Sequence, residues 1–583
     1  MDKPDYSQWS NPDLIARVEY DPSSRAIAPS PQPKSSRVFN ASRYSTRHIA
    51  LKFAYLGQNY NGFEYHTGND TPLPTVEEKL WKALNKAKLI FPTPDPAIGE
   101  GDLNWAGCEY SKCGRTDRGV SAFGQVIGIR VRSNRPLPPS PTDPISRSST
   151  ADSEEKGLIG VPRPSVDDDD GLDNPRREHS TTPFNPITDE LPYTQILNRI
   201  LPPDIRILAW CPDPPPNFSA RFSCRERRYK YFFTNPAFTP TPHQSPPSVA
   251  GGMSNNSQKY PEGWLDIDRM RTAASHFTGL HDFRNFCKVD PSKQIDNFSR
   301  RIFHADIEGP LPASSSSPNF PSPFAPNPTS PSSSSSSSPP TSPTANSATP
   351  ELYAFTLHGS AFLWHQVRHM VAILFLIGQG FESPSLIPTL LDVAANPGKP
   401  QYDIADDAPL VLWDCLFPDL GDEGSERPTE SKGDAMKWRW VGDEQAGGEG
   451  VAVGEKRGWA KDAKWGVGGL VPEMWKVWRR RKMDEVLAGS LLNLTLQQGR
   501  EGEKSVDGGR EKEGAGGGSG KGRGSEKVFL GGDSCKLVGK YVPIMERPRL
   551  DSVEMINRRY VKRMEAQGKK VWGADGRTEE PPA

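Results

Sequence analysis

The feature that most limits the fold of this chain is a run of Ser and Pro over residues 310–349, which contains "PSSSSSSSPP". Two other segments are also poor in apolar residues. Residues 134–189 mix Pro, Ser and Asp, and residues 420–526 are rich in Gly, Glu and Lys. Such sequences bury too little apolar surface to offset the entropy lost on ordering. We therefore expect three disordered insertions and a folded part of about 380 residues, roughly two domains by the usual domain size.

The segments that remain alternate between strand and helix patterns. "HIALKFAYL" has an apolar period of two, and the stretch after it opens with a capping box of Thr75 and Glu78. Further strands are predicted at "FGQVIGIRV", "RRYKYFFT", "RRIFHADIE" and "ELYAFTLHG", and helices at "YTQILNRI" and from Leu363 to Ile377. The Ser/Pro run separates the last two strands, so we interpret it as a loop inserted in a hairpin. Mixed strands, helices and hairpins favour the α+β class over a doubly wound parallel sheet.

Charge and cysteine usage narrow the classes of function. The net charge of −1 gives no whole-chain argument for nucleic acid, so such an argument must rest on local patches. The seven cysteines lack CxxC spacing, and His365 and His369 have neither a Glu between them nor an evident third ligand. The spacing therefore predicts no metal site.

The cysteines and the apolar runs also indicate where in the cell the protein is expected. An odd number of cysteines without an evident signal peptide favours reduced thiols. The most apolar run, "MVAILFLIG", is too short to span a bilayer. We expect a soluble protein of the nucleus and cytoplasm with no membrane partner.

One acidic residue stands out as a candidate for chemistry. Asp117 lies in "CGRTDRGVS", where Gly114 and Gly119 allow sharp bends on both sides of it. Arg115 and Arg118 add positive charge, which favours an ionised carboxylate next to groups able to receive phosphate. For such a segment taken alone, a turn whose Asp caps the backbone is the commoner interpretation.

Two further residues are candidates with open alternatives. Tyr229 lies in "RERRYKY", where basic and aromatic residues interleave as on a nucleic-acid surface, or as on an amphipathic strand with a charged outer face. Arg368 lies early in an otherwise apolar helix. It needs a carboxylate partner if buried, or else its side chain reaches solvent.

Taken together, these stretches resemble the TruA class of tRNA pseudouridine synthases. Four segments match the family in order: "GRTDRGVSAFGQV", "FSARFSCRERRYKYFF", "GLHDFRNFCK" and "GSAFLWHQVRHM". The resemblance covers roughly residues 45–418 apart from the insertions. "SAFLWHQVR" and "PLVLWDC" are most similar to the eukaryotic branch that acts on tRNA positions 38 and 39.

The resemblance implies two ferredoxin-like halves that form one extended antiparallel sheet with a central cleft. Asp117 would be the nucleophile, Tyr229 would stack on the target base and is a candidate for removing its C5 proton, and Arg368 would pair with Asp117. Phosphate contacts would come from Arg115, Arg118, Arg225, Arg227, Arg228 and Lys230. The substrate would be tRNA, no cofactor would be needed, and a homodimer is left open. The alternatives are a TruA-class synthase for other tRNA uridines and a catalytically silent tRNA-binding protein.

The predicted organisation has five parts. A flexible arm (1–44) precedes the N-terminal catalytic half (45–275) and the C-terminal catalytic half (276–419). A largely disordered insertion (420–526) follows, with a Trp/Arg helix near 472–495, and then a C-terminal extension (527–583). "MWKVWRRRKM" fits either a helix on the RNA path or a nuclear import signal.

Overall fold

The computed structural model describes residues 39–68, 71–99, 101–137, 183–241, 260–311, 350–419, 430–443, 463–498 and 525–569. Most of each predicted disordered insertion lies outside these residues. The chain divides into a unit that ends at Tyr44, with a short 3-10 turn at Ala41–Arg43, and a second unit, Ser45–Ala583, that contains the sheet.

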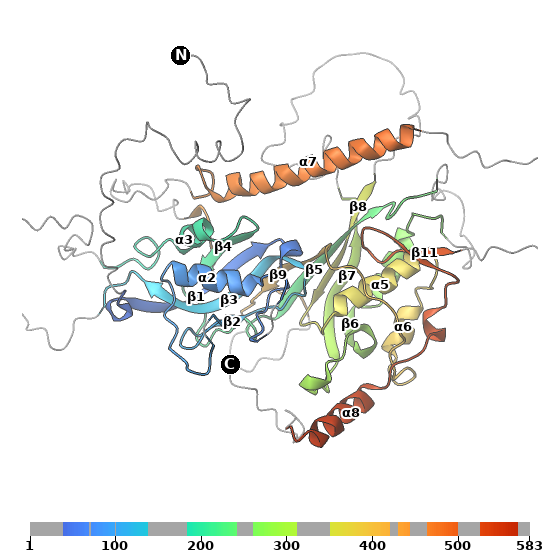
Figure 1. The fold of residues 1–583 in the computed structure, drawn as a ribbon, viewed down its shortest axis with the longest axis horizontal. Helices are drawn as coiled ribbons and strands as arrows, with labels where there is room; N and C mark the ends of the chain where they lie inside the picture. The colour runs from blue at the N-terminus through green and yellow to red at the C-terminus, as the bar shows by residue number, and fades with distance from the viewer. Residues whose placement is uncertain are drawn as a thin grey trace, which may run out of the picture. The chain divides into compact units, whose positions relative to one another are not determined.

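One large sheet organises the second unit (Figure 1). Its order is β10-β4-β1-β3-β9-β5-β8-β7-β6, and β2 pairs with β3 beside this path. The strands are β1 (Ser45–Tyr55), β2 (Ser111–Lys112), β3 (Ser121–Ser133), β4 (Ile205–Cys211), β5 (Glu226–Asn235), β6 (Gly279–Asp282), β7 (Ser299–Glu308), β8 (Glu351–Gly359), β9 (Leu410–Leu416) and β10 (Arg439–Trp440).

Helices cover both ends of the sheet. They are α2 (Val76–Lys86), α3 (Tyr193–Ile200), α4 (Ile267–Ser275), α5 (Gln366–Gly378), α6 (Leu386–Leu391), α7 (Leu470–Gln497) and α8 (Val553–Ala566), with a separate hairpin of β11 (Glu526–Val528) and β12 (Lys536–Val538). The predicted helix start is confirmed, because the Thr75 hydroxyl accepts a hydrogen bond from the Glu78 amide at 3.2 Å.

Two hydrophobic cores lie along the sheet and meet at β9. The first joins β1, β3 and β4 with α2 and α3, and the second joins β5, β7 and β8 with α4 and α5. Leu412 of β9 belongs to the first core and Leu410 to the second, and Tyr229 of β5 packs against both. β9, in the middle of the sheet order, thus connects the part formed by early residues to the part formed by late ones.

The α+β class is confirmed, but the sheet is not antiparallel throughout. β9 runs parallel to β3, with Ser121 opposite Val411 and Ala122 opposite Leu412. The reason is that β9 pairs antiparallel with β5 over most of its length, and this pairing sets its direction. β3 runs in the same direction as β9, so their short contact is parallel.

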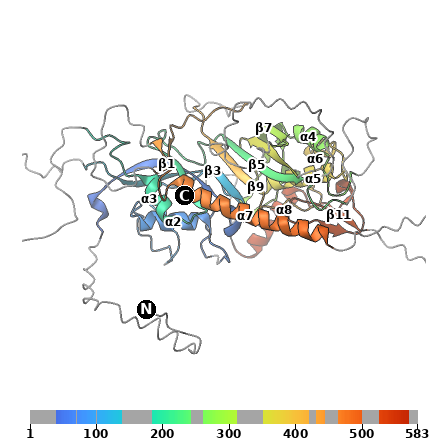
Figure 2. The ribbon, with the colours of Figure 1, turned by 90° about the horizontal axis from the view of Figure 1, so that it is seen from above.

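α7 occupies the segment where the sequence predicted a Trp/Arg helix. None of its residues is buried, and its length of 28 residues includes four consecutive basic side chains, Arg479–Lys482. Figure 2 shows it as the long orange helix. No helix in the described part of the chain is both long and apolar enough to cross a membrane.

The hairpin prediction can be tested by shortening the Ser/Pro run. β7 and β8 pair antiparallel, and the Leu311 amide donates to the Leu352 carbonyl at 2.8 Å, so the strands are joined up to the point where the run begins. Replacing residues 312–346 by a short Gly/Ser turn should leave the rate unchanged and raise the free energy of unfolding by at most about 2 kcal/mol, because closure entropy varies slowly with loop length. Thermal unfolding and product formation are the measurements. A shortened chain that fails to fold or loses activity would refute the hairpin interpretation.

Candidate active site

Asp117 lies in the loop between β2 and β3, and the surrounding backbone holds this loop firmly. The Phe63 amide donates to the Thr116 carbonyl at 3.1 Å, and the Thr116 hydroxyl contacts the Tyr55 hydroxyl at 2.7 Å in the first core. Gly119 has a φ of +79°, and a Cβ there would lie 2.5 Å from Oδ1 of Asp407. Glycine is therefore required at this position both for the turn and for the approach of Asp407.

The carboxyl group of Asp117 is largely enclosed, with 25% of its side chain exposed. Burial is the largest influence and raises its pKa, and the charge of Asp407 acts in the same direction. The charges of Arg368 and Lys288 and a hydrogen bond from Trp364 oppose this rise. The ionised form of Asp117 thus depends on cationic neighbours supplied by distant segments.

Arg368 forms its ion pair with a different acid from the one predicted. Its Nη2 lies 3.5 Å from Oδ2 of Asp407, and its Nε donates to the Ala405 carbonyl at 2.7 Å. The direct pair with Asp117 is therefore corrected to an electrostatic influence on Asp117. The sequence concealed this arrangement, because Asp407 reaches the site only when the loop before β9 packs on α5.

Sequence reasoning missed His365 as a neighbour of Asp117. Its Nε2 lies 3.5 Å from Oδ2 of Asp117, and its φ of +60° places a non-glycine residue in the left-handed region at the start of α5. Burial, followed by the charge of Arg368, lowers the pKa of His365 to about 4, so the ring is neutral at pH 7. An unusual backbone conformation of this kind is often found at functional sites. No pattern in the sequence indicates it.

Tyr229, on β5, is the third of the predicted catalytic residues. Its ring lies edge-on to Phe362 with centroids 5.0 Å apart, and it stands opposite Leu412 of β9 and Leu357 of β8. Burial raises the pKa of its hydroxyl above the ordinary value, with a smaller contribution from the charge of Asp117, so the phenol stays neutral. Asp117, in a loop, therefore lies within electrostatic reach of both Tyr229 on a strand and Arg368 on a helix.

The basic residues of β5 are already engaged within the protein. Arg227 donates to the carbonyls of Ser360, Cys113 and Arg221. Arg228 Nε contacts Glu226 at 2.7 Å, and Lys230 Nζ contacts Glu308 at 2.8 Å. Arg225, just before the strand, is half-buried. These contacts favour a structural role for Arg227 in particular.

The basic residues beside Asp117 are more accessible. Arg115 is 46% exposed and lies 3.4 Å from Glu64, a weak surface ion pair. Arg118 is also exposed, and its charge lowers the pKa of Asp407 against the larger effect of burial. Of the six predicted phosphate contacts, these two are the most available to a ligand.

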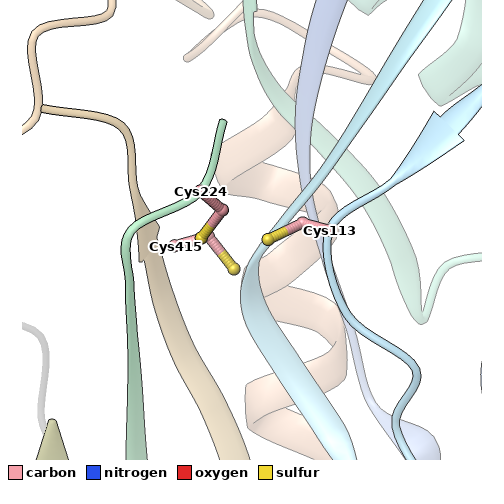
Figure 3. Close-up of side chains that lie close together, drawn as sticks. All are labelled: Cys113, Cys224 and Cys415. Atoms are coloured by element: carbon pink, nitrogen blue, oxygen red, sulfur yellow. The ribbon is translucent and has the colours of Figure 1, made fainter. Parts of the chain in front are cut away.

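Three cysteines far apart in the sequence also meet near this loop. The sulfur atoms of Cys113, Cys224 and Cys415 lie within 4.8 Å of one another, and all three residues are buried (Figure 3). Among the described residues, these three cysteines are the side chains of His, Cys, Asp or Glu that lie close enough together, as a group of three or more, to hold a metal ion. The expectation of scattered thiols without a metal site rested on spacing, and spacing does not reveal contacts between separate segments.

Comparisons with known proteins agree with the order of the motifs. The sequence profile of a family described as tRNA pseudouridine synthase matches residues 273–418. A tRNA pseudouridine(38/39) synthase from Saccharomyces cerevisiae is 36% identical over 436 residues, which cover 71% of this chain and 72% of the yeast protein. The human protein of that name is 36% identical over 389 residues, covering 66% of this chain and 59%, less than two thirds, of its own length. A tRNA pseudouridine synthase A from Methanothrix thermoacetophila is 26% identical over 373 residues.

Proposed function

The chain belongs to the TruA class of tRNA pseudouridine synthases, and we propose that it converts uridine to pseudouridine at positions 38 and 39 of the tRNA anticodon stem-loop. The observation that carries this proposal is the enclosed Asp117 carboxylate, which comes within reach of Tyr229 and Arg368 at the junction of the two cores. The yeast and human relatives named for positions 38 and 39 support the choice of substrate.

We propose that each half of the sheet is a ferredoxin-like unit, with the substrate cleft between the two. In the first half, β1, α2, β2, β3, α3 and β4 follow in sequence, and the strand order is β4-β1-β3-β2. In the second half, β5, α4, β7, β8, α5 and β9 follow once the edge strand β6 and the short helix α6 are set aside, and the order is β9-β5-β8-β7. The boundary between the halves thereby moves from residue 275 to the stretch before β5, because β5 and α4 pack in the second core. The same βαββαβ succession with the same strand order in both halves supports the proposal.

The proposed reaction exchanges one bond to the ribose for another. The Asp117 carboxylate attacks as the nucleophile, the bond between C1′ and N1 of the uracil breaks, and the base turns. A bond then forms between C1′ and C5 as the bond between Asp117 and C1′ breaks, a proton leaves C5, and N1 gains one. The reaction is an isomerisation and is balanced without an added reactant. Tyr229 would stack on the base, and since its phenol is neutral it would take part in removing the C5 proton by passing its own proton on to another acceptor.

We propose Arg115 and Arg118 as the first phosphate contacts, because their side chains are exposed beside Asp117. Such contacts read the shape of the backbone more than its base sequence, so binding should weaken steeply with salt. The target base must also leave its stack, which costs less at the end of a stem than within it. Both features suit the junction of the anticodon stem and loop.

The choice of uridine is tested with tRNA transcripts that carry one uridine each at position 27, 38, 39, 40 or 55. We expect product at 38 or 39 and almost none at the other positions, measured by site-specific detection of pseudouridine. Product at 27 or 55 would keep the class of enzyme but replace the substrate. No product on any transcript or on total tRNA would favour the silent tRNA-binding alternative.

Two further properties remain part of the proposal. We propose a nuclear and cytoplasmic location, where thiols that form no disulfide, like the seven cysteines of this chain, are usual, and imaging of the full chain in cells would test it. A homodimer is allowed by the family resemblance, and light scattering of the purified chain would measure the oligomeric state.

A further inference from the structure

The three-cysteine group is built by segments that belong to different strands. Cys113 follows β2 and precedes Asp117 by four residues, Cys224 precedes β5, and Cys415 lies on β9. Figure 3 shows their sulfur atoms pointing toward one another from these separate segments. The relative exposures are 5%, 5% and 0%. A group so enclosed is shielded from solvent and lies where the two halves of the sheet join.

The distances suit a shared ligand ion. Bonds of about 2.3 Å from zinc to sulfur place tetrahedrally arranged sulfur atoms about 3.8 Å apart. The sulfur atoms of the three cysteines lie within 4.8 Å of one another, which is at most about 1 Å more than in a site that holds zinc. Small side-chain rotations can close such a difference without moving the strands.

A half-buried positive charge lies near the cysteine group. Arg227 stands opposite Cys415 in the sheet, and its Nη2 donates to the Cys113 carbonyl at 3.0 Å. Within the described residues its guanidinium has carbonyl partners and no carboxylate within ion-pair distance. A nearby negative charge stabilises a cation that is partly withdrawn from water. Thiolates would supply it.

Binding of a metal ion displaces the thiol protons, so the three cysteines would become thiolates when the ion binds. A thiolate, unlike a thiol, is a metal ligand. Three thiolates and one divalent ion carry a net charge of about −1, which Arg227 balances.

We propose that Cys113, Cys224 and Cys415 form a thiolate site for a soft closed-shell cation, Zn²⁺ or Cu⁺, which ties the Asp117 loop to β5 and β9. Sulfur ligands favour these two ions over magnesium or calcium. Three sulfur atoms suffice for Cu⁺, and Zn²⁺ would add one further donor, for which the Glu226 carbonyl, 3.3 Å from the sulfur of Cys224, is available. The role is structural: the ion would hold the loop in register with the strands, and it takes no part in the isomerisation.

The test begins with the metal content of the full chain, purified under reducing conditions without chelators and exchanged into metal-free buffer. Elemental analysis should find about one ion of zinc or copper per folded chain. Titrating the metal-free protein with Co²⁺ should produce thiolate-to-metal charge-transfer absorption that Zn²⁺ abolishes. Anaerobic competition with a chromophoric Cu⁺ chelator measures whether the site binds Cu⁺. The loaded protein should also unfold at a higher temperature than the metal-free one.

Single variants locate the site. Cys224→Ser and Cys415→Ala should each lose the bound ion and the Co²⁺ absorption, whereas Cys211→Ser should keep both, because Cys211 is equally buried but lies outside the group. Circular dichroism checks that each variant folds. The wild-type chain, compared with and without metal, shows the effect of losing the ion in the absence of any substitution. Three outcomes would overturn the proposal: no bound ion with all thiols titratable after unfolding, a disulfide within the group found by mass mapping, or the same metal content in all variants.

Discussion

Replacing Asp117 by Asn should abolish pseudouridine formation and leave both the fold and tRNA binding intact. The amide keeps the shape and most of the hydrogen-bonding capacity of the carboxyl group, but it cannot attack C1′. Loss of a catalytic nucleophile lowers turnover by roughly 10,000-fold or more in enzymes where the residue acts directly. Single-turnover assays with excess enzyme measure the rate, and filter binding measures the affinity.

The same variant has an expected effect on stability. Burial raises the pKa of Asp117 in the folded chain above its value in the unfolded chain, so the ionised form destabilises the fold at neutral pH. Asp117→Asn should therefore unfold at the same or a slightly higher temperature at pH 7. The difference should shrink as the pH falls through the raised pKa and vanish below the ordinary Asp pKa of about 3.9, where the carboxyl group is protonated in both states.

A surface substitution provides the control. Asp213→Asn makes the same chemical change at a side chain that is 79% exposed, and it should leave the rate unchanged. Substantial product from Asp117→Asn, with normal product from the control, would remove Asp117 from the role of nucleophile.

Replacing Arg368 by Leu should lower the rate far more than it lowers tRNA affinity. Arg368 is 12% exposed, pairs with Asp407 and favours the ionised form of Asp117. Without it, two enclosed carboxylates lose their compensating charge, a change that typically costs roughly 3–5 kcal/mol. If that cost falls mainly on ionised Asp117, the rate at neutral pH should fall roughly 100- to 1,000-fold.

The pH dependence distinguishes this role from RNA binding. Activity requires ionised Asp117, so the acid limb of the pH–rate profile should follow its pKa. Arg368→Leu removes a charge that lowers this pKa, and the limb should move to higher pH. Asp407→Asn removes a charge that raises it, and the limb should move to lower pH. If Arg368→Leu instead reduces affinity as much as rate, with an unshifted profile, Arg368 is an RNA-binding residue.

Local patterns predicted the elements of the fold well where the pattern was long. The strands at "HIALKFAYL" and "RRYKYFFT" and the helix capped by Thr75 are present with similar bounds. The α+β class followed from these elements. The parallel contact between β3 and β9 did not, because a strand's own residues show its two faces but not its neighbour.

The candidate site was also predictable from the sequence only in part. Asp117, Tyr229 and Arg368 could be named from the sequence, since each lies in a segment that resembles the family. The partner of Arg368 could not, because Asp407 is an ordinary acid in a loop until that loop packs on α5. His365 was considered as a metal ligand and set aside, and its place beside Asp117 depends on the left-handed turn that begins α5.

The sequence by itself determined which residues can do chemistry in this protein, since residue type and local order are written directly in the chain. Only the tertiary structure decided which of them meet. Contacts such as Arg368 with Asp407, and Cys113 with Cys224 and Cys415, join segments separated by long stretches of chain. Their formation depends on the pairing of β5 with β9 and on the two cores that close around it. Hydrophobic burial drives that closure and is not directional, so the sequence pattern leaves open which polar groups it brings together.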